Sequence, residues 1–198
     1  MKGKFIVLEG LDGAGLATQA ALLAQHLKQI GYPVLLTKEP TNSIIGGLSK
    51  AALKGEFLTT SKTLQLLFCA DRAHHLEKEI EPALSHGKIV VCDRYLFSTL
   101  AYGYASKVNY KWLRYVNLNF RLPDIGLFID VKPSTSIIRI SDEDSGIQLF
   151  DEKQQLEKVR QAYSQVAREF HLKKIDGGAS IGDISTKINK MVDKLMSV

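Results

Sequence analysis

The sequence predicts an α/β fold in which a parallel β-sheet of about five strands carries helices on both faces. Three observations predict this fold. Five apolar runs rich in β-branched residues are continuous rather than alternating, which is typical of strands that are buried on both faces. Segments with helical periodicity separate these runs, and this alternation indicates a parallel sheet. The 198 residues, 45% hydrophobic and 24% charged, fit a single domain with a substantial core.

The first strand is expected at 5–9, where the sequence reads "FIVLE". A helix is expected at 18–31, "TQAALLAQHLKQIG", because its apolar residues recur with helical spacing. This segment closes on Gly31, a residue type that commonly ends helices. The second strand is expected at 33–37, "PVLLT".

The longest helix is expected at 64–87, "LQLLFCADRAHHLEKEIEPALSHG", which ends on Gly87. Pro82 is a candidate for a kink in it, because proline cannot donate the helical hydrogen bond. We interpret the histidines of this segment as residues of the helix surface rather than as ligands.

The remaining strands are expected at 88–93 ("KIVVCD"), 125–131 ("IGLFIDV") and 173–176 ("KKID"). Strongly helical sequence at 152–170 precedes the last of them, and a helix at 181–196 follows it.

Composition excludes several classes of protein. The net charge of +5 is spread along the chain, so a nucleic-acid-binding arm is not expected. Cys69 and Cys92 lie in apolar stretches without metal-ligand spacing, and we interpret them as buried thiols. No apolar run reaches the ~18 residues of a membrane span, and no signal peptide is recognisable. We therefore expect a cytoplasmic protein that binds neither membrane nor nucleic acid.

Polar residues follow three of the predicted strands. Asp12 and several glycines come after the first, Glu39 after the second, and Asp93 with Arg94 after the third. In open parallel sheets, ligands bind at the carboxyl ends of the strands. These residues are therefore expected to line one crevice.

Residues 10–19, "GLDGAGLATQ", have the spacing of a phosphate-binding loop, Gly-x4-Gly-Lys-Ser/Thr. The glycines allow a tight turn, and the backbone N–H groups and the helix N-terminus attract an anion. The alternative is a turn without a ligand, but the position between a strand and a helix favours a P-loop NTPase-type fold. The candidate phosphate-binding residues are Gly10, Leu11, Asp12, Gly13, Ala14, Gly15, Leu16, Ala17 and Thr18.

Two further segments carry candidate chemistry. Asp93 can hold Mg²⁺ beside phosphates and Arg94 can bind phosphate oxygens, although an Asp–Arg pair at a strand end is also common without function. Phe68 and Arg72 are four residues apart on a predicted helix, so they share one face. A base can stack on the ring while the guanidinium contacts the base edge; the alternative is a core phenylalanine beside a solvated arginine.

Taken in order, these motifs resemble the thymidylate kinase family of P-loop nucleoside-monophosphate kinases. The matching segments cover nearly the whole chain: "FIVLEGLDGAG", "TKEPTNSIIGGLSKAAL", "LLFCADRAHHLEKEIEPAL", "GKIVVCDRYLFSTLAYG", "PDIGLFIDV", "FDEKQQLEKVRQAYSQVA" and "ID". The resemblance implies transfer of the ATP γ-phosphate to dTMP, giving dTDP, with Mg²⁺ as cofactor and a homodimer formed through helices.

The resemblance also implies roles for individual residues. It places dTMP against Glu39, Pro40, Lys50, Phe68, Arg72, Arg94, Thr99 and Tyr102. It places ATP at the loop residues named above, with Arg139 near the adenine. It makes Asp12, Asp93 and Arg94 the candidate catalytic residues, with Asp93 and Asp12 as candidate metal ligands.

The chain departs from the family pattern at two places. Leu16 and Ala17 stand where the family has lysine and Ser/Thr, so a cation for the donor phosphates and a hydroxyl for Mg²⁺ are missing. The lid segment, about 140–150, is acidic, and Arg139 at its edge is the one nearby candidate for a transition-state arginine. Such an arginine contributes ~10³–10⁵ in rate, so phosphoryl transfer is expected to be slow.

Three interpretations of this loop follow. The chain is a slow dTMP kinase, or a catalytically impaired nucleotide-binding paralogue with a regulatory or partner role, or a protein whose loop was engineered as a trap. Leu16 is expected to lie where a lysine would reach toward the donor phosphates. The alternative is that Leu16 packs against the sheet and a lysine comes from elsewhere, such as Lys38 or Lys50, although both are expected on the acceptor side.

Overall fold

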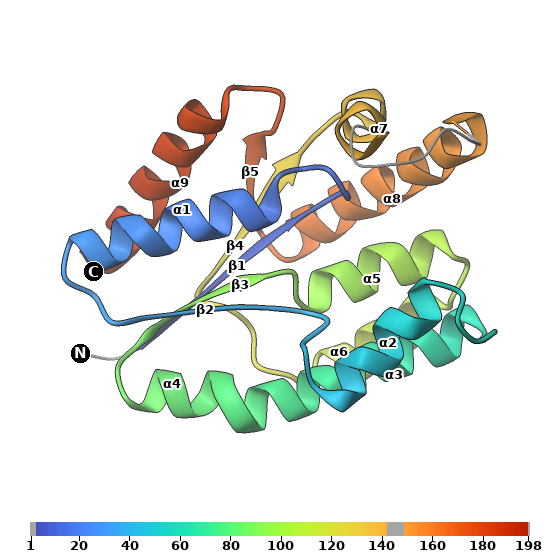
Figure 1. The fold of residues 1–198 in the computed structure, drawn as a ribbon, viewed down its shortest axis with the longest axis horizontal. Coiled ribbons are helices and arrows are strands. Elements are labelled where there is room, and N and C mark those ends of the chain that lie inside the picture. The colour runs from blue at the N-terminus through green and yellow to red at the C-terminus, as the bar shows by residue number, and fades with distance from the viewer. Residues whose placement is uncertain (1–2, 142–148, 198) are drawn as a thin grey trace.

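A parallel five-stranded sheet forms the centre of the protein, as a computed structural model of residues 3–141 and 149–197 describes it (Figure 1). The strand order is β2-β3-β1-β4-β5, and every neighbouring pair is parallel. The strands are β1 (Lys4–Gly10), β2 (Val34–Lys38), β3 (Ile89–Asp93), β4 (Ile125–Asp130) and β5 (Lys173–Asp176). All five predicted strands are confirmed to within one or two residues.

Helices cover both faces of this sheet, as predicted (Figure 1). The helices α1 (Leu16–Gln29) and α9 (Ile181–Met196) pack against each other on one face. The other face carries α3 (Ser61–His75), α5 (Leu96–Ala105) and α8 (Leu149–Glu169), with α5 between the other two. Three shorter helices are α2 (Ile44–Leu53), α6 (Tyr110–Asn117) and α7 (Pro133–Ser141).

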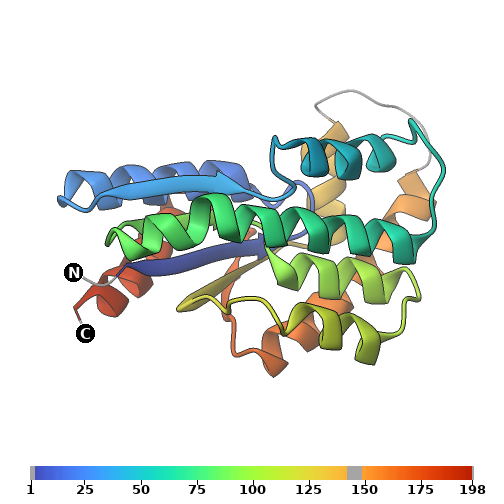
Figure 2. The same ribbon diagram turned by 90° about the horizontal axis from the view of Figure 1, so that it is seen from below.

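The predicted long helix is confirmed, but it contains an irregular turn. It runs through α3, the π-helical turn η1 (Leu76–Ile80) and α4 (Glu81–Ser85), and Figure 2 shows the three as one continuous rod. The π-helical turn ends two residues before Pro82, where a backbone N–H for the regular ladder is missing. Gly87 ends the rod with a φ of 73°, and Gly31 follows α1 with a φ of 94°, both as expected.

The core lies on both sides of the central strands. Phe5, Ile6, Val7 and Leu8 of β1 are fully buried, which explains their continuous apolar sequence. The edge strands β2 and β5 are partly exposed. Cys69 and Cys92 are buried free thiols, as predicted. No helix of the described residues is long and apolar enough to cross a membrane.

The sequence interpretation missed α2, α5, α6 and α7. Residues 142–148, most of the predicted lid, lie outside the described residues.

Candidate active site

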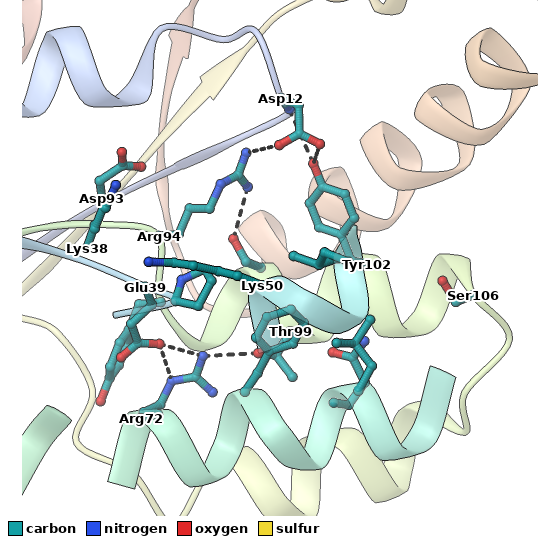
Figure 3. A pocket seen from close by; sticks show the side chains of 17 residues that line it. Asp12, Lys38, Glu39, Lys50, Arg72, Asp93, Arg94, Thr99, Tyr102 and Ser106 are labelled. Atoms are coloured by element: carbon teal, nitrogen blue, oxygen red, sulfur yellow. Dashed lines mark hydrogen bonds and ion pairs between the residues drawn. The ribbon is translucent and has the colours of Figure 1, made fainter. Parts of the chain in front are cut away.

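Two cavities open at the carboxyl ends of the strands and meet at Asp93 and Arg94, which line both. The Phe68 cavity, of about 500 Å³, lies between α2, α3 and α5 (Figure 3). The Leu16 cavity, of about 560 Å³, lies over the loop between β1 and α1. The structure therefore brings the residues that follow β1, β2 and β3 to one crevice, as predicted.

The Phe68 cavity is lined by all eight residues that the resemblance places against dTMP. Glu39 and Pro40 follow β2, Lys50 comes from α2, and Thr99 and Tyr102 from α5. Lys38, the other lysine considered as a substitute cation, also lines this cavity. Both lysines therefore lie on the expected side.

Arg72 is buried at the base of the Phe68 cavity, with 2% of its surface exposed. Its Nε donates to Glu39 Oε2 at 3.0 Å, its Nη1 to Asn117 Oδ1 at 2.6 Å and its Nη2 to Thr99 Oγ1 at 3.0 Å. A buried charge needs such partners. The solvated arginine of the alternative interpretation is therefore wrong.

The Glu39 carboxylate contacts two basic side chains, Arg72 and His75. Its Oε2 lies 2.8 Å from Arg72 Nη2, and its Oε1 lies 3.1 Å from Nδ1 of His75. His75 also contacts Thr37 Oγ1 at 2.8 Å and is 1% exposed. The interpretation of His75 as a surface residue is wrong, because its side chain is buried. Its contacts with Thr37 and Glu39 connect β2 to α3.

Arg94 is fixed between the two cavities. Its backbone has a φ of 68°, in the left-handed region that non-glycine residues rarely adopt. Nη2 donates to Asp12 Oδ1 at 2.7 Å, while Nη1 donates to the Gly10 carbonyl at 2.9 Å and to Ser98 Oγ at 3.2 Å. Figure 3 shows the guanidinium directed toward Asp12.

Asp12 is engaged on both of its carboxylate oxygens. Oδ1 accepts from Arg94, and Oδ2 accepts from the Tyr102 hydroxyl at 3.0 Å. The Tyr102 ring also lies against the Arg94 guanidinium, 5.5 Å from ring centre to Cζ. This arrangement suits Asp12 for orienting Arg94 and Tyr102 more than for binding a metal ion.

Glu9 is a residue of this site that the sequence interpretation missed. It is fully buried, Oε1 accepts from Tyr95 N–H at 2.9 Å, and Oε2 accepts from the Ser98 hydroxyl at 2.6 Å and the Tyr163 hydroxyl at 3.0 Å. Both hydroxyls also accept from Arg94. The sequence did contain a signal for Glu9, because it is a charged residue at the end of an otherwise apolar strand.

Burial raises the pKa of Glu9 from 4.5 to about 7, although its hydrogen bonds and Arg94 act in the opposite direction. Between these two values the folded state holds one more proton than the unfolded state. The free energy of unfolding should therefore fall by about 3 kcal/mol as the pH rises from about 4.5 to about 7. Glu9→Gln removes this contribution.

Urea unfolding at about pH 5 and about pH 7.5 measures this difference. We expect the parent to lose more stability over this interval than Glu9→Gln, whereas the exposed control Glu56→Gln should behave as the parent does. Equal slopes in the parent and Glu9→Gln would show that Glu9 titrates normally.

Asp93 is the residue best suited to a magnesium ion. Its Oδ1 is buried and has no hydrogen-bond partner among the described residues, and the residue lines both cavities. Burial raises the pKa of Asp93, and Arg94 and Lys38 counteract this effect. The described residues contain no cluster of three or more metal-ligating side chains. A bound Mg²⁺ would therefore need oxygens of the nucleotide as well, which fits a metal that binds through one carboxylate and substrate phosphates.

The loop between β1 and α1 has the backbone that an anion site requires. Gly13 and Gly15 have φ values of 74° and 81°, and α1 begins at Leu16 without a side-chain cap. The first N–H groups of a helix have no partner within it, and the residues of this first turn line the Leu16 cavity. Of the residues expected at the ATP phosphates, all but Gly10 and Asp12 line this cavity.

Leu16 does not lie as expected. Its side chain is 5% exposed and belongs to the hydrophobic core, and its Cδ2 lies 3.3 Å from where a Cβ on Gly10 would be. The side chain thus turns inward and borders the cavity from the core side, as the alternative proposed. The lysine required by that alternative is absent, because among the described residues the cationic side chains that line the Leu16 cavity are Arg94 and Arg139.

Helix α7 packs directly on the loop. Ser136 Oγ donates to the Asp12 carbonyl, and Arg139 donates to the carbonyls of Gly13 at 3.3 Å and Gly177 at 3.1 Å. A Cβ on Gly13 would lie 2.7 Å from the Ser136 carbonyl oxygen, so only glycine fits there. Arg139 therefore lines the expected cavity, but part of its guanidinium holds the backbone.

Comparisons with known proteins agree on one family. A family model described as Thymidylate kinase matches residues 8–188. The chain is 41% identical to a "Probable thymidylate kinase" of Pyrococcus horikoshii, over 97% of each chain. It is 39% identical to a "Probable thymidylate kinase" of Pyrococcus abyssi over 97% of each chain, and 35% identical to a "Thymidylate kinase" of Prochlorococcus marinus over 96% of this chain and 95% of that protein.

Proposed function

Because this chain belongs to the thymidylate kinase family, we propose that it binds ATP and dTMP and transfers the ATP γ-phosphate to dTMP, giving dTDP. One observation carries this proposal: the eight residues expected at dTMP follow β2 and β3 or belong to the helices α2, α3 and α5, and all of them line one cavity. In it the thymine would stack on Phe68, and the dTMP phosphate would lie toward Lys50 and Arg94.

ATP would bind in the Leu16 cavity, with its phosphates on the backbone N–H groups of the loop. The Asp93–Arg94 pair would then lie between donor and acceptor phosphates, because both residues line both cavities. Phosphoryl transfer depends on placing the two phosphates and stabilising their charge. Asp12, Glu9 and the hydroxyl of Ser98 would keep Arg94 oriented for this task.

Mg²⁺ is the cofactor that we propose, held by Asp93 together with nucleotide oxygens; when bound, it neutralises phosphate charge. Asp12 remains a candidate ligand, but its oxygens would first have to leave Arg94 and Tyr102.

The reaction would be slow, because Leu16 and Ala17 contribute neither charge nor a hydroxyl. Loss of one charge-stabilising donor costs ~10²–10³ in rate in enzymes where it has been measured. The backbone part of the phosphate site is intact, so ATP binding should suffer less than turnover.

A second candidate function is that of a nucleotide-binding paralogue with little or no catalysis and a regulatory or partner role. The position of Leu16 favours it: the leucine is turned inward and buried, Arg139 holds the loop, and no lysine of the described residues lines the Leu16 cavity. A kinase assay with ATP, Mg²⁺ and dTMP distinguishes the two functions.

We also propose a cytoplasmic homodimer formed through helices. Exposed apolar side chains on α2, α3 and α6 support it, among them Leu48, Leu66 and Tyr115 with exposures of 47%, 45% and 77%. Exposed apolar groups of this kind mark protein–protein contacts when they gather on one face.

Calorimetry with dTMP alone tests the acceptor site, independently of turnover. We expect saturable binding by the parent and weaker binding by Phe68→Ala, since stacking of a base on an aromatic ring contributes ~1–3 kcal/mol. Phe57→Ala is the matched control, because Phe57 does not line the Phe68 cavity. Absence of binding at millimolar dTMP would remove the acceptor site and, with it, the proposed substrate.

A further inference from the structure

Asp71 of α3 is a buried carboxylate that the proposed phosphoryl transfer does not use. It is 1% exposed. Its Oδ2 accepts from the Thr41 backbone N–H at 2.7 Å, and its Oδ1 accepts from the hydroxyls of Thr41 at 2.6 Å and Ser43 at 3.0 Å. A carboxylate is buried only with partners of this kind. Asp71 therefore fixes the chain on both sides of Asn42, in the loop between β2 and α2.

The first turn of α2 is attached to the same loop. The Ser43 hydroxyl caps this helix by accepting from the Gly46 backbone N–H at 3.0 Å. Gly46 packs so closely on Thr41 that a Cβ would collide with the Thr41 carbonyl oxygen. Residues 41–43 and α2 are thus held together, and this unit carries both Asn42 and Lys50.

The Asn42 side chain contacts Lys50 directly. Lys50 Nζ donates to Asn42 Oδ1 at 2.6 Å. Lys50 lines the Phe68 cavity and extends over it from α2 (Figure 3), whereas Asn42 is exposed and does not line this cavity. Asn42 would therefore act on a ligand through Lys50 rather than by direct contact.

The partner of Lys50 is neutral, unlike those of the two arginines that line the same cavity. Arg72 lies 2.8 Å from the Glu39 carboxylate, and Arg94 lies 2.7 Å from that of Asp12. An amide oxygen orients the ammonium group of Lys50 without cancelling its charge. It also uses only one of the three ammonium N–H groups, so the others can donate to a phosphate.

We propose that Asn42 is a positioning residue that keeps the Lys50 ammonium group in place for the phosphate of dTMP. A lysine side chain loses much rotamer freedom when it binds. A hydrogen bond from a loop that Asp71 fixes removes part of this loss before the ligand arrives. This inference rests on the proposed function and names the residue that adjusts the affinity of the acceptor site for a phosphate.

Calorimetry with dTMP and with thymidine, which lacks the phosphate, tests this role. In Asn42→Ala the Kd for dTMP should rise about 3- to 10-fold, the range for one long side chain that is no longer held. In Asn42→Asp it should rise at least as much, because a carboxylate pairs with Lys50 and repels the phosphate. The Kd for thymidine should change by less than about twofold in both variants. Asn119→Ala, at another exposed asparagine, is the matched control and should bind as the parent does.

The same measurement in a Lys50→Met background separates positioning from a structural role. There Asn42→Ala should leave the Kd for dTMP unchanged, because the group through which Asn42 acts is gone. A purely structural residue would instead weaken dTMP binding equally in both backgrounds, and it would weaken thymidine binding as well.

Unchanged dTMP binding by Asn42→Ala, equal weakening of dTMP and thymidine, or an effect that persists in Lys50→Met would overturn the inference and leave the proposed function standing. A parent that binds dTMP no tighter than thymidine would also overturn it, since Lys50 would then hold no phosphate. If the parent binds neither ligand, the proposed function fails together with the inference.

Discussion

Replacing Leu16 by lysine and Ala17 by threonine should raise the rate of dTMP phosphorylation at least tenfold, which corresponds to about 1.4 kcal/mol removed from the activation barrier. Both residues line the Leu16 cavity at the first turn of α1. A lysine there would supply the donor side with a mobile cation that, among the described residues, it lacks. The threonine would supply a hydroxyl ligand for Mg²⁺.

The ammonium group of the new lysine cannot stay in the apolar space that the Leu16 side chain fills. Its aliphatic stem can stay against Gly10 while the ammonium group reaches the cavity. We therefore expect the fold to persist. Initial rates of ADP formation from ATP, Mg²⁺ and dTMP measure the gain, and Leu16→Met with Ala17→Thr is the matched control, because methionine conserves volume without adding charge.

A double variant that is no faster than the parent would contradict this prediction. Either the parent already uses a substitute cation, or the missing lid arginine limits the rate. A third change that places an arginine within 141–148 separates these explanations, since it accelerates the reaction only in the second case.

Glu39→Gln should lower the free energy of unfolding by about 3–5 kcal/mol, because it leaves the buried Arg72 without its charged partner. The pair is 2.8 Å apart, and the two side chains are 2% and 6% exposed. His75 loses its carboxylate contact in the same variant. Urea unfolding followed by circular dichroism measures the change.

The exposed pair of Lys54 and Glu56 provides the comparison. Its side chains are 73% and 59% exposed at 3.9 Å, so Glu56→Gln should change stability by less than about 1 kcal/mol. Glu39→Gln combined with Arg72→Met should recover part of the loss, because the uncompensated charge is gone. A loss below about 1 kcal/mol for Glu39→Gln alone would show that Arg72 finds another anion or water.

The strands and the cavity-lining residues could be predicted, because their signals are local. Buried parallel strands need continuous apolar sequence, and the residues after them must lie at one sheet edge. The missed helix α2 contains the pair Gly46–Gly47, which lowers its helical propensity. Gly46 is needed for close packing, since a Cβ at this position would lie 2.3 Å from the Thr41 carbonyl oxygen.

Pairings between distant side chains could not be predicted. Glu9 and His75 act through partners from other elements, so one sequence does not reveal which polar residue is buried or what it contacts. The direction of Leu16 is of the same kind: helix spacing fixes where its Cα lies, whereas packing against Gly10 decides where its side chain goes.

The position of Asp93 and Arg94 in the wall shared by both cavities has a thermodynamic consequence. A nucleotide in one cavity changes the field and the hydrogen bonds of a pair that the other nucleotide also meets. The two binding equilibria are then linked, and linkage is reciprocal. Whatever factor dTMP imposes on the affinity for ATP, ATP must impose on the affinity for dTMP, whether or not a phosphoryl group ever passes between them.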